Sequence, residues 1–270
     1  MRAIWSGSIS FGLVNIPVKL FKATASKSVQ FHQLDKKSGA RVRNKRVSEK
    51  NGREVPYDRI VKGYELDRNR YVTVEPEELE SIEPHGPKVI GIEEVVQLED
   101  IDPRQFDRAY WLTPADEGSA KPYALLLRAL GSSDRVAIGR FVLRTKEHLA
   151  AVRAIDRGLA LHTMLFADEL VPIDEIPGLP MKAKVAATER RMAEQLLDAM
   201  TVAWNPKRHK DTYRERVLDL IERKGKGEEI VVTGPPEEET AEVVDLMAML
   251  EQSVAAAKGK RSKTTRKKSA

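Results

Sequence analysis

The fold is constrained most by a series of short segments in which apolar and polar residues alternate, separated by turn residues. Residues 14–20 alternate in this way, and Pro17 restricts their strand to a sheet edge or an early position. Gly91 predicts a bend or bulge in a later strand. The further predicted strands are residues 29–34, 70–74, 89–98, 107–112, 136–143, 149–155 and 159–166.

Two short helices are predicted between these strands. One begins at Pro76, and the other is capped by Ser119, carries an apolar stripe from Tyr123 to Leu130 and ends at Gly131. Many short strands with so few helices predict a mixed β and α fold whose core is an antiparallel β-barrel, over residues 1–170.

The composition of the sequence changes after the predicted barrel. Residues 171–181 are rich in proline, which predicts an extended linker. Residues 182–257 are predicted to be helical, with helices at 182–204, 209–224 and 237–257. Residues 258–270 are a Lys/Arg/Ser/Thr tail, which is predicted to be disordered.

One segment, residues 36–53, is far more basic than the rest of the barrel region. It carries a local net charge of +7, and Asn51-Gly52 forms a pair typical of tight turns. We expect a short β-ribbon that concentrates cations along a projecting edge, although a hairpin that only aids solubility fits the same pattern. The candidate contacts to a phosphate backbone are Lys36, Lys37, Arg41, Arg43, Lys45, Arg46 and Arg53.

The remaining charge supports a polyanionic partner. The tail contributes another +7, so the rest of the chain carries −9 although the whole chain carries +5. Cations gathered into two segments of an acidic protein indicate focused binding of a polyanion. The candidate tail contacts are Lys258, Lys260, Arg261, Lys263, Arg266, Lys267 and Lys268, and secondary candidates in the barrel are Arg140, Arg144 and Lys146.

The sequence offers little for catalysis or metal binding. It has no cysteine, and its five histidines have no metal-ligand spacing. Asp168, Glu169 and Asp174 are acids that a Mg²⁺-dependent nuclease could use, but acids beside Pro-rich loops are usually only solvated. No phosphate-binding lysine loop, dinucleotide fingerprint or nucleophile elbow occurs. We therefore expect a non-enzymatic protein without cofactor or metal, soluble and intracellular.

The basic segment indicates a particular mode of nucleic-acid binding. No aromatic residue lies between its cations, so stacking on single-stranded bases is not indicated there. Cations without base-reading side chains favour contact with the backbone of a duplex, which carries no sequence information. A sequence-independent architectural protein of the nucleoid fits this pattern as well.

Several blocks of the sequence resemble the bacterial Ku proteins. They are RAIWSGSISFGLVNIPVKLFKA, KRVSEKNGREVPYDRIVKGYEL, FDRAYWLTPADEGSAKPYALLLRAL and WNPKRHKDTYRERVLDLIERKGKGEEI, which occur in the order of that family. The resemblance covers about residue 2 to about residue 233.

This resemblance implies a homodimer in the bacterial cytoplasm, associated with the nucleoid. Its SPOC-like barrels and arms would form a ring around the ends of double-stranded DNA during non-homologous end joining. The cations of residues 36–53 would line the ring, and the helices after residue 182 would recruit a multifunctional ATP-dependent DNA ligase. A lysine-based lyase acting at damaged ends is a further alternative.

The sequence departs from its relatives in two ways. Some relatives carry cysteines near the positions of Ser38, Ser48 and Asn51, where a metal could brace the hairpin. Here the rigidity of the hairpin is expected to come from the β-ribbon itself. The basic tail is short, which argues against a strong tail-dependent effect such as inward sliding along DNA.

Overall fold

The structure is a computed structural model, which describes residues 1–82, 88–179, 183–228, 249 and 253–254. The chain divides into two compact units. The first contains residues 1–27 and 31–172, whereas the second contains residues 28–30 and begins again at residue 173. Among the described residues, no helix is long and apolar enough to cross a membrane.

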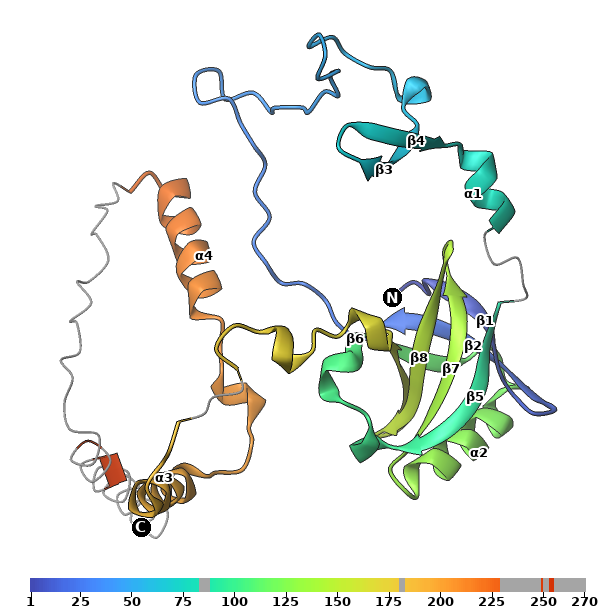
Figure 1. Ribbon diagram of the computed structural model, residues 1–270, viewed down its shortest axis with the longest axis vertical. Helices are drawn as coiled ribbons and strands as arrows, with labels where there is room; N and C mark the ends of the chain where they lie inside the picture. The colour runs from blue at the N-terminus through green and yellow to red at the C-terminus, as the bar shows by residue number, and fades with distance from the viewer. Residues whose placement is uncertain (83–87, 180–182, 229–248, 250–252, 255–270) are drawn as a thin grey trace. The chain divides into compact units, whose positions relative to one another are not determined.

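The first unit contains a closed β-barrel whose strands follow one another in the order β1-β2-β6-β9-β8-β7-β5 (Figure 1). All neighbouring strands are antiparallel except β1 and β5, whose parallel pairing closes the barrel. The predicted barrel is therefore confirmed, with one parallel pair. Its strands are β1 (Trp5–Phe11), β2 (Val14–Lys22), β5 (Val89–Gln97), β6 (Phe106–Pro114), β7 (Arg135–Leu143), β8 (Lys146–Ile155) and β9 (Gly158–Met164).

Two positions show how the local sequence allows this closure. Pro17 pairs with β1, and the pairing of β2 with β6 begins one residue later, at Val18. The missing N–H of Pro17 is therefore tolerated early in a strand that is not at an edge. A Cβ on Gly139 would lie 2.1 Å from the carbonyl oxygen of Gly91, so the close approach of β5 and β7 requires glycine there. The predicted irregularity of β5 follows at Ile92–Glu94.

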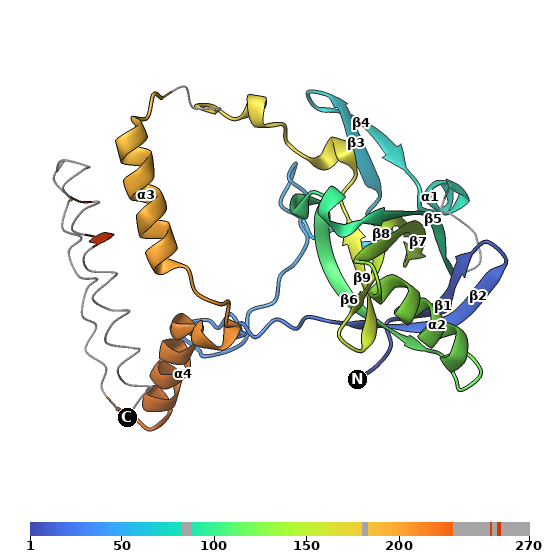
Figure 2. The same cartoon turned by 90° about the horizontal axis from the view of Figure 1, so that it is seen from below.

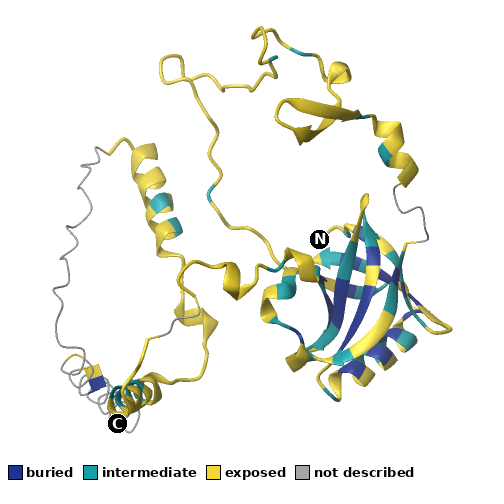
Figure 3. Ribbon diagram, in the orientation of Figure 1, coloured by how far each residue is buried: buried dark blue, intermediate teal, exposed yellow. Residues whose placement is uncertain are grey.

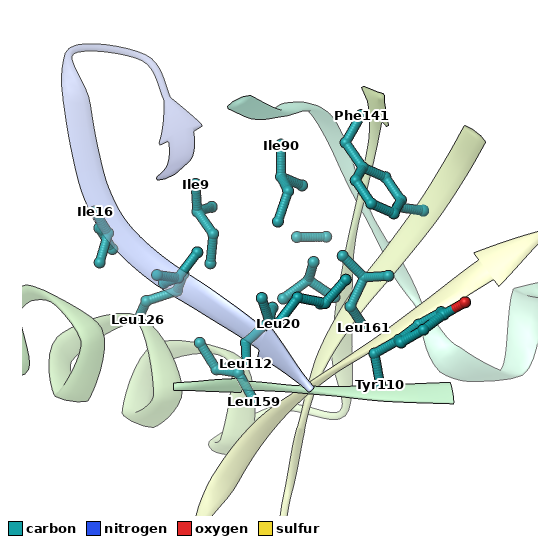
Figure 4. Packing of buried hydrophobic residues seen from close by; sticks show 14 of the residues in the cluster. Ile9, Ile16, Leu20, Ile90, Tyr110, Leu112, Leu126, Phe141, Leu159 and Leu161 are labelled. Atoms are coloured by element: carbon teal, nitrogen blue, oxygen red, sulfur yellow. The ribbon is translucent and has the colours of Figure 1, made fainter. Parts of the chain in front are cut away.

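The barrel interior is filled by aliphatic side chains from every strand (Figure 4). Figure 3 shows that buried residues are concentrated in the barrel strands and α2. Ile9, Leu20 and Leu161 are fully buried there. Burial of each such side chain stabilises the fold by about 1.5–3 kcal/mol. At the margin, the indole of Trp5 donates a 3.0 Å hydrogen bond to the carbonyl of Val142, which satisfies its polar atom.

Helix α2 (Ala120–Gly131) packs against β6, β7 and β8 and closes the barrel on one side. Tyr123 anchors it, because its hydroxyl donates to the carbonyl of Leu112 and accepts from the N–H of Leu159, both at 2.8 Å. Ser119 precedes the helix as predicted but does not cap it. Its Oγ instead donates to Asp116.

A long excursion connects β2 to β5. The strand predicted at residues 29–34 is wrong, because only Leu34 forms an isolated β-bridge, to Arg41. The later part of the excursion forms the 3₁₀ turn η1 (Tyr57–Arg59), a two-stranded hairpin of β3 (Lys62–Asp67) and β4 (Arg70–Val74), and α1 (Pro76–Ile82). Outside this excursion, 3₁₀ turns of the first unit lie at Leu98–Asp100, Pro103–Gln105 and Ala167–Glu169, and another, at Ile173–Glu175, lies where the second unit begins again.

The second unit contains α3 (Ala187–Met200), the 3₁₀ turn η6 (Pro206–Arg208) and α4 (Thr212–Gly225). The predicted helix 182–204 is therefore shorter at both ends, whereas 209–224 agrees with α4. Neither α3 nor α4 has a buried residue, so these helices have no apolar core between them. The helix predicted at 237–257 lies almost entirely outside the described residues, and so does the tail at 258–270.

Candidate nucleic-acid interface

The basic segment folds as two compact turns, and not as the continuous β-ribbon that we predicted. Each turn is closed by a single isolated β-bridge, Leu34 to Arg41 and Val47 to Glu54. Within the described part of the chain, no strand pairs with the cationic stretch between these two bridges.

The first turn is held by the carboxylate of Asp35. This group accepts hydrogen bonds from the backbone N–H groups of Lys37 at 3.3 Å and Ser38 at 3.0 Å, and from the Ser38 hydroxyl. These bonds, led by that of the hydroxyl, lower the pKa of Asp35 below its ordinary value. Gly39 completes the turn with a φ of +69°, a conformation that glycine adopts without steric cost.

The second turn has the same construction. The carbonyl of Ser48 accepts from the N–H of Gly52 at 2.8 Å, and the side-chain carbonyl of Asn51 accepts from the N–H of Arg53 at 3.1 Å. Gly52 has a φ of +67°. The two turns are therefore closed by hydrogen bonds of Asp, Ser and Asn, and not by the ladder of a β-ribbon.

The predicted cations of this segment are all exposed, but three of them have side-chain partners. Lys45 Nζ lies 2.6 Å from Glu54 Oε2, Arg41 Nη2 lies 2.9 Å from His32 Nδ1, and the Arg46 guanidinium stacks on Tyr57. Within the described part of the chain, no ion pair is formed by Lys36, Lys37, Arg43, Lys50 or Arg53. These five cations remain available for a phosphate backbone.

The secondary candidates in the barrel differ from one another. Arg140 lies 3.3 Å from both Glu93 and Glu147, so its charge is shared with two carboxylates. Arg144 lies in the β7–β8 turn with a φ of +65°, an unusual conformation for a residue other than Gly, Asn or Asp. Lys146 follows it at the start of β8.

Arg144 and Lys146 border a cavity of about 370 Å³ at one end of the barrel, together with Lys22 and Arg108. Carboxylates line the same cavity, and one of them, that of Asp107, lies 3.6 Å from Arg108. Cations and acids are therefore mixed here, unlike in the basic segment.

The acids considered for a nuclease are Asp168, Glu169 and Asp174. Among the residues that the structure describes, no three His, Cys, Asp or Glu side chains are grouped so that they could hold a metal ion. Glu169 instead accepts a hydrogen bond from the N–H of Phe166 at 2.8 Å, which closes a 3₁₀ turn. The seven predicted cations of the tail, Lys258 to Lys268, lie outside the described residues.

Two residues near the basic segment were not anticipated. Glu54 neutralises Lys45, and Tyr57 supports Arg46. The signal for both was present in the sequence, since an acid and an aromatic residue follow the cations within a few positions. Their contacts depend on how the second turn closes, which the sequence pattern does not specify.

Comparison with known proteins gives a consistent result. Residues 10–195 match the family described as "Ku70/Ku80 beta-barrel domain". A protein from Anaeromyxobacter sp. (strain K) with the name "Non-homologous end joining protein Ku" is 46% identical, over 95% of this chain and 86% of that protein. Proteins of the same name from Heliobacterium modesticaldum and Mycobacterium tuberculosis (strain H37Rv) are 41% and 40% identical. These matches cover 97% and 95% of this chain, and 95% and 96% of those proteins, respectively.

The family match includes every barrel strand except part of β1, and the full-length relatives extend the similarity to nearly the whole chain. The chain therefore belongs to the Ku family.

Proposed function

We propose that this protein is a non-enzymatic homodimer that binds the ends of double-stranded DNA in non-homologous end joining. The observation that carries the proposal is the exposed basic segment of residues 36–53, in which hydrogen-bonded turns display a net charge of +7. Contacts from such cations to phosphates give affinity without sequence preference. The names of the relatives support the assignment to this pathway.

Selection of ends requires a second copy of the chain. A single small barrel cannot surround a duplex, but two copies related by a two-fold axis can, and this is the commonest symmetry of soluble oligomers. A closed ring can be loaded only where the DNA has a free end. The preference for ends then follows from topology, with the cations of residues 36–53 lining the opening.

The other parts of the chain have separate roles in this proposal. Residues 1–170 form the barrel, 171–181 act as a linker, and 182–257 form an arm that recruits a multifunctional ATP-dependent DNA ligase. The tail at 258–270 adds contacts to the phosphate backbone, and Arg144 and Lys146 extend the surface of the barrel that meets DNA. The protein then acts in the nucleoid of the cytoplasm.

A competition experiment tests the ring. Labelled linear duplex bound to the full-length protein is challenged with the same duplex, linear or covalently closed. We expect only the linear competitor to displace the label, and a salt titration to give a slope of log K of about −7 if eight phosphates are neutralised. Equal competition by closed DNA would instead indicate an architectural protein that coats duplexes.

A further inference from the structure

Figure 2 shows the segment that connects α3 to α4. This segment contains an exposed aromatic pair, Trp204 and His209. Trp204 is 76% exposed, the most exposed of the three tryptophans of the chain. Its indole stacks on the imidazole of His209, with ring centroids 4.9 Å apart and planes inclined by 20°. One face of the indole is therefore covered by His209, and its exposure leaves the other face accessible.

The backbone between these two residues holds the stack in place. Asn205 caps the short turn η6, because its side-chain carbonyl accepts a hydrogen bond from the N–H of Lys207 at 3.1 Å. The N–H of His209 donates to the carbonyl of Pro206 at 3.1 Å, which returns the chain toward Trp204. A prolyl ring and a side-chain cap in one turn reduce its conformational freedom, so the aromatic pair is pre-organised.

Three cations lie beside or between these two residues in the sequence. Lys207, Arg208 and Lys210 are exposed, and none of them forms an ion pair with another described residue. The nearest acid, Asp211, accepts the N–H of Arg214 at 2.9 Å as the N-cap of α4. The segment 204–210 thus combines an open aromatic face with three unpaired positive charges.

An aromatic face beside unpaired cations matches the chemistry of a single-stranded nucleotide. Every base can stack on an indole, and its phosphates attract the neighbouring cations. The residues 36–53 have cations but no aromatic residue between them, so they are suited to duplex backbone alone. The two segments therefore differ in the form of DNA that they can bind.

We propose that Trp204, backed by His209, stacks on an unpaired base in the single-stranded overhang of a DNA end, with Lys207, Arg208 and Lys210 at the adjacent phosphates. This inference rests on the proposed end binding and deepens it. A base stacked on one aromatic side chain strengthens binding by about 5- to 150-fold. The protein then binds ends with overhangs more tightly than blunt ends.

The test uses full-length protein with the substitutions Trp204→Ala and Trp204→Phe, and duplexes with blunt ends or single-stranded overhangs. We expect Trp204→Ala to lower the affinity for overhangs to the blunt-end level and to leave blunt-end binding unchanged. Trp204→Phe keeps an aromatic face and retains most of the preference. Tyr213→Ala is the matched control, because Tyr213 is 77% exposed on α4 but lies outside the stacked pair.

Fluorescence gives an independent readout. Overhang binding should quench the emission of the wild-type protein, and Trp204→Phe should remove most of that quenching, because Trp5 and Trp111 are only 7% and 36% exposed. The inference is overturned if Trp204→Ala weakens blunt and overhanging ends equally. It is also overturned if that variant sediments as a monomer, since the indole would then pack against a second copy.

The experiment separates the two proposals. Failure of the wild-type protein to bind blunt ends would contradict the proposed end binding. A free single-stranded oligonucleotide would still report on Trp204 in that case, because stacking on this residue requires no duplex. Quenching by that oligonucleotide would support the stacking site, and the absence of quenching would overturn it.

Discussion

The guanidinium carbon of Arg46 lies 5.0 Å from the centroid of the Tyr57 ring, so an exposed aromatic side chain orients one of the candidate DNA contacts. Cation–π contacts at exposed sites contribute about 0.5–1 kcal/mol. The contact also restricts the rotamers of Arg46, which lowers the entropy lost when the guanidinium binds a phosphate.

We expect Tyr57→Ala to weaken binding of linear duplex by about two- to five-fold, without unfolding the protein. Tyr57→Phe keeps the ring and should bind as tightly as the wild type. Fluorescence anisotropy at fixed salt measures the difference, and circular dichroism checks the fold. Equal affinity of the alanine and phenylalanine variants would show that Arg46 does not depend on this ring.

The ion pair of Lys45 and Glu54 makes a second prediction. Glu54→Gln removes the carboxylate that lies 2.6 Å from Lys45 Nζ, which frees this ammonium for a phosphate. We expect tighter binding and a salt slope that steepens by about 0.9, the contribution of one phosphate contact. Salt-titrated binding curves measure both quantities.

Glu49→Gln is the control for this experiment. It changes the net charge of the chain by the same amount, but Glu49 forms no ion pair with another described residue. Its salt slope should match that of the wild type. If both variants steepen the slope alike, net charge alone governs binding and the pair with Lys45 has no specific role.

The contact of Gly139 with β5 predicts a large effect on stability. A methyl group on Gly139 would lie 2.1 Å from the Gly91 carbonyl oxygen and 2.8 Å from its carbonyl carbon, so the two strands would have to separate. We expect Gly139→Ala to lower the free energy of unfolding by about 1–3 kcal/mol. Gly91→Ala should cost less, because nothing lies within 4 Å of its added Cβ. Urea denaturation of both variants measures the contrast.

His162 predicts a pH dependence of barrel stability. Burial lowers the pKa of its imidazole below the ordinary value of 6.5, and the charge of Arg153 lowers it further. As the pH falls, His162 is therefore protonated at a higher pH in the unfolded chain than in the folded chain. The contribution of the neutral His162 imidazole to stability is therefore complete above pH 6.5. This contribution is lost as the pH falls through the lowered pKa of the folded state.

We expect the thermal midpoint to decrease between about pH 7.5 and about pH 5.5, and His162→Gln to reduce this decrease. The measured quantity is the difference in thermal midpoint between the two pH values. A loss of stability that is the same at both pH values in the variant therefore does not affect it. His148 has a pKa lowered by burial as well and contributes a decrease of the same sign. An unchanged pH dependence in His162→Gln would assign the effect elsewhere.

The sequence predicted most of the barrel because its signals are local. The alternation of Ile16, Val18 and Leu20 marks side chains that are fully buried in β2. Strand β1 was missed, although Trp5 and Ile9 occupy the buried positions of the same two-residue period. Its small residues obscured the pattern. Gly7 is required there because an added Cβ would lie 2.4 Å from the Trp5 ring.

The candidate interface was predictable in charge and not in shape. The density of Lys and Arg located the segment, and Asn51-Gly52 located one turn correctly. The other turn depends on the hydrogen bonds of Asp35 with Ser38. A single pair of residues such as this produces no periodic pattern in the sequence. The stack of Trp204 on His209 escaped prediction for a similar reason, since the turn at Pro206 brings them together.

The pairing of β1 with β5 has a consequence for how this protein can vary. The chain leaves the barrel at the end of β2, at Lys22, and is again part of it from Val89 at the start of β5; both strands are paired with β1. The intervening chain is thus an insertion between two barrel strands, and it contributes no strand to the barrel. Loop-closure entropy changes slowly with length, so insertions of different length or charge can be exchanged while the barrel keeps its fold. We therefore expect that exchanging this segment between relatives transfers the proposed DNA affinity with it.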